Sequence, residues 1–291
     1  MTSSTEQTQA PPTERLLAEL AELPGVVVAF SGGADSALVL AAAVRALGAD
    51  RVVAATAVSS SLPMVERGPA AAFSASLGVT HHWLDTHEMD RDGYRANSGA
   101  RCYFCKAELL EVLGELGREL GWPVATGTNA DDAVAGFRPG IRAAAERGAI
   151  TPLLSAGFDK EQVRAVSHDW QLPTWDKPAA ACLSSRIAYG IGITPARLAR
   201  VERAEAAVRA HWAEQAPLTD LRVRDLGEGR ARLEVDRPAL EAFECGAWAE
   251  PVLAGIRDAG FDQVEVRAFR SGSMNDALRS HGDDPARPSS T

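Results

Sequence analysis

A glycine pair between an apolar run and an alanine-rich segment constrains the fold of this chain more than any other feature. Residues 26–40 read VVVAFSGGADSALVL. The valine-rich run at 26–30 is typical of a parallel strand buried on both faces, and residues 37–47 favour a helix. Gly32 and Gly33 allow a sharp turn and the close approach of an anion to backbone N–H groups. The sequence therefore predicts a strand, a phosphate-binding loop and a helix in succession.

Polar groups in this loop favour a pyrophosphate as the ligand. Ser31 and Ser36 supply hydroxyl donors, and the N-terminus of the following helix directs N–H groups and a partial positive charge at the turn. Asp35 beside phosphates is explained by a divalent cation. A capped helix after a Gly-Gly turn would contain the same residue types, but the order of strand, loop and helix favours a nucleotide site. We predict that Ser31, Gly32, Gly33, Asp35 and Ser36 bind ATP with Mg2+.

Strand and helix patterns continue to alternate along the chain. Residues 52–58 and 79–84 favour strands, and residues 65–77 between them favour a helix. Residues 106–120 favour another helix, which precedes a short strand at 123–126. This alternation predicts an α/β fold with a doubly wound parallel sheet.

The loop after the last of these strands is rich in short polar side chains. Ligands of open parallel sheets bind beyond the carboxyl ends of the strands, so we expect residues 127–132 to face the same site as the glycine loop. Asn129, Asp131 and Asp132 are candidates for contacts with adenine or Mg2+. Ordinary turn formation explains these residue types equally well.

The sequence changes character after about residue 190. Residues 195–212 favour a helix, and short strand patterns follow at 221–223, 231–235 and 263–266. We expect a smaller C-terminal α+β domain for substrate binding or oligomerisation. The predicted organisation is a tail at 1–12, a nucleotide-binding domain at 13–190, the second domain at 191–280 and a tail at 281–291.

The overall charge limits the class of partner. The chain carries 39 acidic and 30 basic side chains, a formal net charge of −9, so no general positive field attracts nucleic acid. No apolar run approaches the length of a membrane span, and the first residues lack the pattern of a signal peptide. These features predict a cytoplasmic protein without nucleic acid or membrane partners.

Two cysteines lie close together in the segment Arg101-Cys102-Tyr103-Phe104-Cys105-Lys106. The two flanking cations are expected to lower the pKa values of the thiols and so favour thiolates, which bind metals or act as nucleophiles. A zinc site would need further ligands, for which His82 and His87 are the candidates. The alternative is that both cysteines are small apolar residues of a core.

A third cysteine lies in the segment KPAAACLSSR at residues 177–186. Pro178, small residues and the cations Lys177 and Arg186 indicate a loop that holds the Cys182 thiol in a positive field, as suits a nucleophile. Cys245 has no such neighbours and is interpreted as a core residue.

The loop SGGADS matches the signature of the PP-loop ATP pyrophosphatase superfamily, which adenylates an acceptor oxygen and releases pyrophosphate. Together with NSGARCYFCK, GTNADDAVAGFRPG, KPAAACLSSRIAYG and FRSGSMN, it resembles the LarE family of ATP-dependent sulfur transferases. The resemblance extends from about residue 14 to residue 278. Members of this family help to build the nickel-pincer nucleotide cofactor of lactate racemase.

This resemblance implies a two-stage reaction on pyridinium-3,5-biscarboxylic acid mononucleotide. ATP with Mg2+ would adenylate a ring carboxylate, and sulfur would then replace AMP at the acyl carbon. Because all three cysteines of the family's cluster-bearing members are present, we expect Cys102, Cys105 and Cys182 to hold a [4Fe-4S] cluster with one iron free to carry a sulfide. In the alternative mechanism Cys182 forms a thioester and gives up its own sulfur, leaving dehydroalanine.

Several polar side chains are candidates for the substrate's phosphate and carboxylates, because guanidinium groups bind oxyanions in bidentate geometry. They are Arg138, Arg186, Arg222, Arg224, Arg270 and Ser271. Ordinary surface ion pairs remain an equal alternative for the arginines. Glu202 and Glu205 lie about one helical turn apart and are candidates for acid/base work near Cys182, or for a solvated helix face.

We also expect a homo-oligomer, and the resemblance implies that it works with other nickel-pincer biosynthesis proteins. Two other functions fit the loop: a tRNA thiolase, which would need a basic RNA-binding surface, and an ATP-binding sensor without chemistry.

Overall fold

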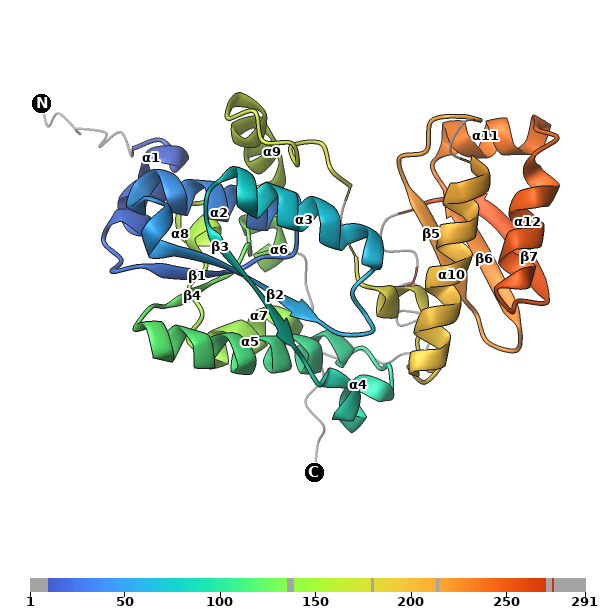
Figure 1. Ribbon diagram of the computed structural model, residues 1–291, viewed down its shortest axis with the longest axis horizontal. Helices are drawn as coiled ribbons and strands as arrows, with labels where there is room; N and C mark the ends of the chain where they lie inside the picture. The colour runs from blue at the N-terminus through green and yellow to red at the C-terminus, as the bar shows by residue number, and fades with distance from the viewer. Residues whose placement is uncertain (1–9, 135–138, 179–180, 213–214, 271–273, 275–291) are drawn as a thin grey trace, which may run out of the picture. The chain divides into compact units, whose positions relative to one another are not determined.

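The valine-rich run forms β1 (Val26–Ala29), in which all four residues are buried. β1 pairs in parallel with β2 (Val52–Val58) on one side and with β4 (Val124–Ala125) on the other. β3 (Thr80–Asp85) lies beyond β2, so the strand order of this parallel sheet is β3-β2-β1-β4 (Figure 1). The structure, a computed structural model, describes residues 10–134, 139–178, 181–212, 215–270 and 274.

Helices cover both faces of this sheet. Val26 and Val28 pack with α2 (Ala34–Leu47) in the main core, whereas Val27 and Ala29 pack with Leu113 of α5 (Arg101–Leu120) on the opposite face. The main core also includes residues of α1 (Pro12–Ala21), α3 (Met64–Ser76), α8 (Pro152–Ser155) and α9 (Lys160–Asp169). The predicted doubly wound α/β fold is therefore confirmed.

The C-terminal part forms a second core around a three-stranded sheet. β5 (Leu221–Asp225) pairs antiparallel with β6 (Arg230–Val235), which pairs in parallel with β7 (Gln263–Ala268). The helices of this part are α10 (Pro195–Trp212), α11 (Arg237–Cys245) and α12 (Ala249–Asp258). Trp212 is fully buried and stacks on Phe243 with ring centroids 5.5 Å apart. The predicted α+β character of this part is confirmed.

The described residues form two compact units whose boundaries differ from the predicted cut near residue 190. The first contains the described residues of Met1–Ala57, Gly68–Leu84 and Leu109–Ala179, and the second those of Val58–Arg67, Asp85–Glu108 and Ala180–Thr291. Segments 58–67 and 85–108 belong to the second unit because they hydrogen-bond within it. For example, Leu183 N donates to Ser61 O over 2.8 Å.

Short elements complete the chain. Three 3-10 turns occur in the described residues, at Ala49–Arg51, at Glu88–Asp90 before α4 (Asp92–Arg95), and at Leu183–Arg186. α6 (Ala130–Val134) begins inside the predicted loop at 127–132, and α7 (Pro139–Glu146) follows it. The predicted tails lie almost wholly outside the described residues. Within the residues that the structure describes, no helix is both long enough and apolar enough to cross a membrane.

His81 on β3 is a half-buried side chain whose ring packs edge-on against Phe30 of the main core. Its Nε2 lies 2.8 Å from the Thr56 hydroxyl, which donates its own hydrogen to Phe30 O, so Nε2 carries the hydrogen. Nδ1 is buried and has no hydrogen-bond partner in the described structure. Burial, and to a smaller extent the neighbouring His82, lowers the pKa of His81 to about 4. Protonation at Nδ1 would place a charge where no acceptor exists.

This lowered pKa predicts acid sensitivity of the fold. The unfolded chain takes up a proton near pH 6.5, whereas the folded chain does so near pH 4, so the free energy of unfolding should fall as the pH drops through this window. We expect a loss of about 2 kcal/mol, less than the full shift because solvent partly screens the ring. Denaturant titrations of wild type, His81→Gln and the exposed-site control His168→Gln at several pH values measure it. A pH dependence that is unchanged in His81→Gln would contradict the assignment.

Candidate functional site

The glycine loop follows β1 and is held by its own serines. Ser31 N donates to the Ser36 hydroxyl over 3.2 Å, and this hydroxyl donates to Gly33 O over 3.2 Å. The two serine hydroxyl oxygens lie 3.1 Å apart. Gly32 adopts a φ of +73°, which side-chain-bearing residues rarely adopt. The loop is thus already turned around the N-terminus of α2, which starts at Ala34 and not at the predicted residue 37.

A second loop, from the end of β4, lies against the glycine loop. Asn129 is fully buried, and its Nδ2 donates to Asp35 Oδ1 over 2.8 Å. Its Oδ1 accepts from Asp132 N over 3.0 Å. β1 and β4 are neighbours in the sheet, so their carboxyl ends bring the two polar segments together. The structure therefore places Asn129 and Asp132 beside Asp35, as expected from the sequence.

Gly127 makes this approach of the two loops possible. A β-carbon at this position would lie 2.8 Å from Ser36 N and 3.0 Å from Asp35 C, both in the backbone at the start of α2. Backbone atoms cannot move away as a flexible side chain can. The sequence prediction missed this role, because only the pairing of distant strands creates the close approach.

We expect Gly127→Ala to separate the two loops and to weaken ATP binding by about tenfold to a hundredfold, the effect of misplacing a positioned site by about 1 Å. Calorimetric titration of the variant with ATP and Mg2+ measures the affinity. Gly114→Ala is the matched control, because a β-carbon there would have no atom within 4 Å. Equal affinity in the Gly127 variant and wild type would contradict the role of Gly127.

The charges around Asp35 suit a divalent cation. Burial raises the pKa of the Asp35 carboxyl, and Asp132 raises it further, whereas Asn129 and Lys160 act in the opposite direction. Lys160 Nζ lies 3.2 Å from Asp132 Oδ1. A bound Mg2+ would relieve the repulsion between the two carboxylates, which are the oxygen ligands that this ion prefers. Asp131 differs, because its Oδ2 accepts from Lys160 N and so caps α9.

Lys177 is a candidate ATP-binding residue, whereas the sequence analysis predicted that it lies beside the Cys182 thiol. Its Nζ donates to Gly32 O over 2.9 Å, within the glycine loop. Arg164 NH2 donates to Lys177 O over 3.3 Å and so holds the segment that carries the lysine. A lysine at a phosphate loop is a common phosphate ligand. No local pattern could reveal it, since 145 residues separate Lys177 from Gly32.

The three candidate cysteines lie on two segments of the second unit. Cys102 and Cys105 lie in the first two turns of α5, which begins five residues before the predicted helix. Cys182 directly precedes the 3-10 turn at Leu183–Arg186. Cys102 is exposed, whereas Cys105 and Cys182 are partly buried, and none of the three forms a disulfide. Cys245, the last residue of α11, is exposed as well, so the interpretation of Cys245 as a core residue is wrong. Cys105 packs against the core of the second unit.

Burial reverses the predicted pKa shift of Cys105. Its thiol pKa is raised, first by burial and then by the neighbouring Cys182, Glu88 and Cys102, while Lys106 only partly opposes the shift. The expectation that flanking cations lower its pKa is therefore wrong. The pKa of Lys106 is itself lowered by burial, which weakens the positive field on which that expectation relied. The two cysteine segments lie close together, because Arg101, the residue before Cys102, donates to the backbone oxygen of Ser184, two residues after Cys182.

Cysteine thiols can serve as ligands either of a single metal ion or of an iron-sulfur cluster. Among the described residues, no group of three or more His, Cys, Asp or Glu side chains converges on the position of one metal ion, so the zinc alternative with His82 and His87 gains no support. In a [4Fe-4S] cluster the cysteine ligands bind different irons and need not converge on one point. Three neighbouring thiols are the ligand type that such a cluster requires.

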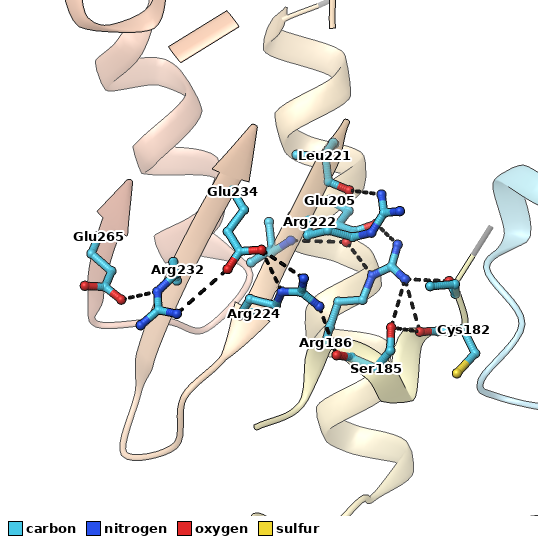
Figure 2. Close-up of polar contacts among 12 residues, drawn as sticks. Cys182, Ser185, Arg186, Glu205, Leu221, Arg222, Arg224, Arg232, Glu234 and Glu265 are labelled. Atoms are coloured by element: carbon cyan, nitrogen blue, oxygen red, sulfur yellow. Dashed lines mark hydrogen bonds and ion pairs between the residues drawn. The ribbon is translucent and has the colours of Figure 1, made fainter. Parts of the chain in front are cut away.

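A group of arginines lies next to the Cys182 segment (Figure 2). Arg186 donates to Glu205 Oε1 over 2.9 Å and also to Cys182 O. Arg224 donates to Glu234 Oε2 and to Ser185 O. Burial lowers the pKa of Arg222, as do the neighbouring Arg186 and Arg224, whereas Glu205 raises it. An anion bound among these guanidinium groups would reduce their mutual repulsion.

Both glutamates of α10 accept hydrogen bonds from backbone N–H groups, but only Glu205 is buried. Glu205 is 2% exposed, and besides Arg186 its Oε1 accepts from Val223 N over 3.1 Å. Glu202 accepts from Met64 N over 2.7 Å. Glu205 lies on the same face of α10 as the apolar residues Val201, Ala204 and Val208. This spacing is the sequence signal that could have identified Glu205 as buried. These contacts favour a structural role for both glutamates over acid/base work.

We expect Glu205→Gln to reduce the free energy of unfolding by about 3–5 kcal/mol, because it leaves the buried guanidinium of Arg186 without its counter-charge. Arg186 and Glu205 side chains are only 4% and 2% exposed. Thermal unfolding of the variant measures the loss. Glu241→Gln on the surface of α11 serves as the control. An unchanged melting temperature would show that this ion pair does not hold α10 to the Cys182 segment.

The remaining candidates lie at the edge of the described segments or outside them. Arg138 and Ser271 lie outside the described residues. Arg270 is exposed immediately after β7 and before the segment that is not described.

Comparison with known proteins identifies the family. The NAD synthase family model matches residues 15–99, which include the glycine loop. A pyridinium-3,5-bisthiocarboxylic acid mononucleotide synthase of Lactiplantibacillus plantarum is 31% identical over 265 residues, covering 90% of this chain and 93% of that protein. An uncharacterized Synechocystis protein is 39% identical over 268 residues, covering 91% and 97%. An NH3-dependent NAD+ synthetase of Methanosarcina mazei is 46% identical over only 66 residues, or 22% of this chain.

The share of the chain that each relative covers shows whether the relative has one domain in common with this chain or belongs to the same family. Similarity to the NAD+ synthetase is limited to 22% of the chain, whereas similarity to the mononucleotide synthase covers 90% of it and nearly the full length of that protein. The chain therefore belongs to the LarE family of PP-loop proteins and is an enzyme that uses ATP to transfer sulfur.

Proposed function

We propose that this enzyme adenylates a carboxylate of pyridinium-3,5-biscarboxylic acid mononucleotide and converts it to a thiocarboxylate for nickel-pincer nucleotide biosynthesis. The observation that carries the proposal is the presence, in one chain, of a preformed pyrophosphate loop and of three neighbouring cysteines. Full-length similarity to a mononucleotide synthase of matching chemistry supports it.

The first unit supplies the ATP chemistry. The loop N–H groups and the N-terminus of α2 would bind the pyrophosphate portion of ATP, and Lys177 would add a positive charge. Asp35 and Asp132 would hold Mg2+. A carboxylate oxygen of the substrate then attacks the α-phosphorus of ATP, the bond to pyrophosphate breaks, and an acyl adenylate forms. AMP is a far better leaving group than oxide, so the acyl carbon becomes open to sulfur.

The second unit supplies the sulfur chemistry. Cys102, Cys105 and Cys182 would hold a [4Fe-4S] cluster, whose iron without a cysteine ligand supplies a site for the sulfide to be transferred. Binding of the cluster would deprotonate Cys105 despite its raised pKa, since coordinated thiols lose their protons. In the alternative mechanism, the Cys182 thiolate displaces AMP to give a thioester. Removal of its α-proton and cleavage of its C–S bond then leave dehydroalanine and the thiocarboxylate.

The arginine group would bind the negatively charged substrate. Arg222 and Arg224 lie two residues apart on β5 and project to one face, and Arg186 lies beside them. A phosphate or carboxylate of the substrate would be held there by charge-assisted hydrogen bonds. Arg270, Arg138 and Ser271 are proposed as further contacts.

The proposed chemistry also bears on the cellular compartment of the enzyme and on its partner proteins. All four cysteines are free thiols, which suits a reducing compartment such as the cytoplasm. We propose a homo-oligomer that receives its substrate from, and passes its product to, other proteins of nickel-pincer biosynthesis.

Release of pyrophosphate tests the substrate. Purified enzyme with ATP and Mg2+ is assayed with the pyridinium dicarboxylate mononucleotide, with tRNA, and without an acceptor. The proposal expects release only with the pyridinium substrate. Release that requires tRNA would identify a tRNA thiolase, and ATP binding without release in any arm would identify a sensor.

Anaerobic purification distinguishes the two sulfur mechanisms. Iron and sulfide analysis of the reconstituted protein should give a cluster that is absent from a Cys102→Ala variant. A protein without bound iron whose Cys182 loses the elements of hydrogen sulfide during turnover would establish the sacrificial route instead.

A further inference from the structure

A chain of buried polar side chains joins the two segments that carry the cysteines. Arg101 is the first residue of α5 and immediately precedes Cys102. Its NH1 donates to Asn97 Oδ1 over 2.7 Å and to Ser184 O over 2.9 Å, and Ser184 lies two residues after Cys182. Its NH2 lies 3.9 Å from Cys102 Sγ, within the range of a hydrogen bond to sulfur. One guanidinium group therefore contacts both cysteine segments.

Asn97 completes the connection. Its Nδ2 donates to Ala188 O over 2.8 Å and to Ile191 O over 2.9 Å, in the stretch that follows the Cys182 turn. Asn97 is fully buried and has a φ of +51°, so it turns the chain between α4 and α5 while it makes these bonds. Tyr94, also fully buried, hydrogen-bonds the Ser184 hydroxyl through its own OH. Several hydrogen bonds therefore join residues 94–101 to residues 184–191, and together they fix the position of one segment relative to the other.

The side chain of Arg101 suits this task in a way that lysine would not. It is 6% exposed, and its guanidinium carbon lies 5.2 Å from the centre of the Tyr189 ring. A planar guanidinium group can donate in several fixed directions at once, whereas an ammonium group is a point charge on a flexible stem. Burying such a charge is tolerated only when its donors are satisfied, and here they are satisfied by both cysteine segments.

We propose that Arg101 is the positioning residue of the sulfur-transfer centre, which holds the α5 cysteines and Cys182 in the placement that sulfur transfer requires. This inference rests on the proposed function, since it assigns a task to a residue beside those cysteines. The chain would thus place its thiols before a cluster or substrate binds, and binding would not have to order them.

The test uses the full-length protein with Cys245→Ser, which removes the exposed thiol on α11. Arg101→Gln removes the charge and most donors, and Arg101→Lys keeps only the charge. Arg95→Gln is the matched control, because Arg95 is the last residue of α4 and lies two residues before Asn97. Its side chain is 48% exposed and forms an ion pair with Asp92. Dibromobimane, which bridges two nearby thiols, measures the rate at which Cys182 is linked to Cys102 or Cys105, read by peptide mass spectrometry.

We expect wild type and the Arg95 variant to cross-link at the same rate, and both Arg101 variants to cross-link about 10- to 100-fold more slowly, the range seen when a residue that orients site ligands is removed. Thiocarboxylate formation should fall by a similar factor in kcat, with the KM for ATP and the affinity for ATP unchanged. Cross-linking at the wild-type rate in Arg101→Lys would overturn the proposal, since charge alone would then suffice. Unfolding of both Arg101 variants would also overturn it, because Arg101 would then determine folding and not cysteine placement.

Failure of the proposed function would look different. If wild type forms no thiocarboxylate from the pyridinium substrate while the Arg101 variants still lose cross-linking, the substrate assignment is wrong and the positioning role stands.

Discussion

Replacement of Cys182 by alanine should abolish thiocarboxylate formation and leave ATP binding unchanged. Both proposed mechanisms require this sulfur, either as a cluster ligand or as the atom that is transferred, so the loss should be at least about a thousandfold. The glycine loop belongs to the other unit, and its hydrogen bonds do not involve Cys182. Mass spectrometry of the product and calorimetric titration with ATP measure the two effects.

Substitution of Cys245 provides the control, and substitution of Cys102 or Cys105 distinguishes the cluster mechanism from the sacrificial mechanism. Cys245→Ser, on the exposed end of α11, should retain wild-type activity. Under the cluster mechanism, Cys102→Ala and Cys105→Ala should lose activity as completely as the Cys182 variant. Under the sacrificial mechanism both should still complete one turnover. An active Cys182→Ala enzyme would contradict both mechanisms.

Asp35→Asn should reduce kcat/KM for pyrophosphate release by about a hundredfold to a thousandfold, the range seen when a group that stabilises developing charge is removed. The substitution preserves size but removes the charge that we assign to Mg2+. Because Asp132 also raises the pKa of Asp35, the wild-type carboxyls repel each other until a cation binds. The variant should therefore show a weaker dependence of rate on the Mg2+ concentration.

A matched neighbour separates this effect from a general change of surface charge. Glu161→Gln lies in the exposed first turn of α9, next to Lys160, and should leave the rate unchanged. Pyrophosphate release measured over a range of Mg2+ concentrations gives both results. An Asp35→Asn enzyme with the wild-type response to Mg2+ would exclude Asp35 as a cation ligand.

Features encoded over short distances were predictable from the sequence. The buried strand, the glycine turn and the presence of the helix after it depend on residues close together in the sequence, although α2 starts three residues earlier than predicted. The approach of the loop at 127–132 to the glycine loop was expected from the rule that parallel strands end at one edge, whereas the hydrogen bond from Asn129 to Asp35 was not predicted.

Features that depend on tertiary burial were not predictable in the same way. Lys106 is next to Cys105 in sequence, but packing of Cys105 against the second core raises its thiol pKa despite this neighbour. Lys177 was assigned to Cys182, five residues away, yet the fold brings it to Gly32. The sequence analysis predicted only that the charge of Arg101 acts on the adjacent thiols. Its hydrogen bond to Ser184 O could not be predicted, because 83 residues separate the two positions.

Transfer of oxygen from substrate to AMP tests the central claim most directly. The enzyme is supplied with ATP, Mg2+ and pyridinium dicarboxylate mononucleotide whose carboxylates carry oxygen-18, and AMP and product are analysed by mass spectrometry. Adenylation followed by attack of sulfur predicts one labelled oxygen in the phosphate of AMP for each thiocarboxylate formed. Thiocarboxylate formed together with unlabelled AMP would contradict activation of the carboxylate through the glycine loop.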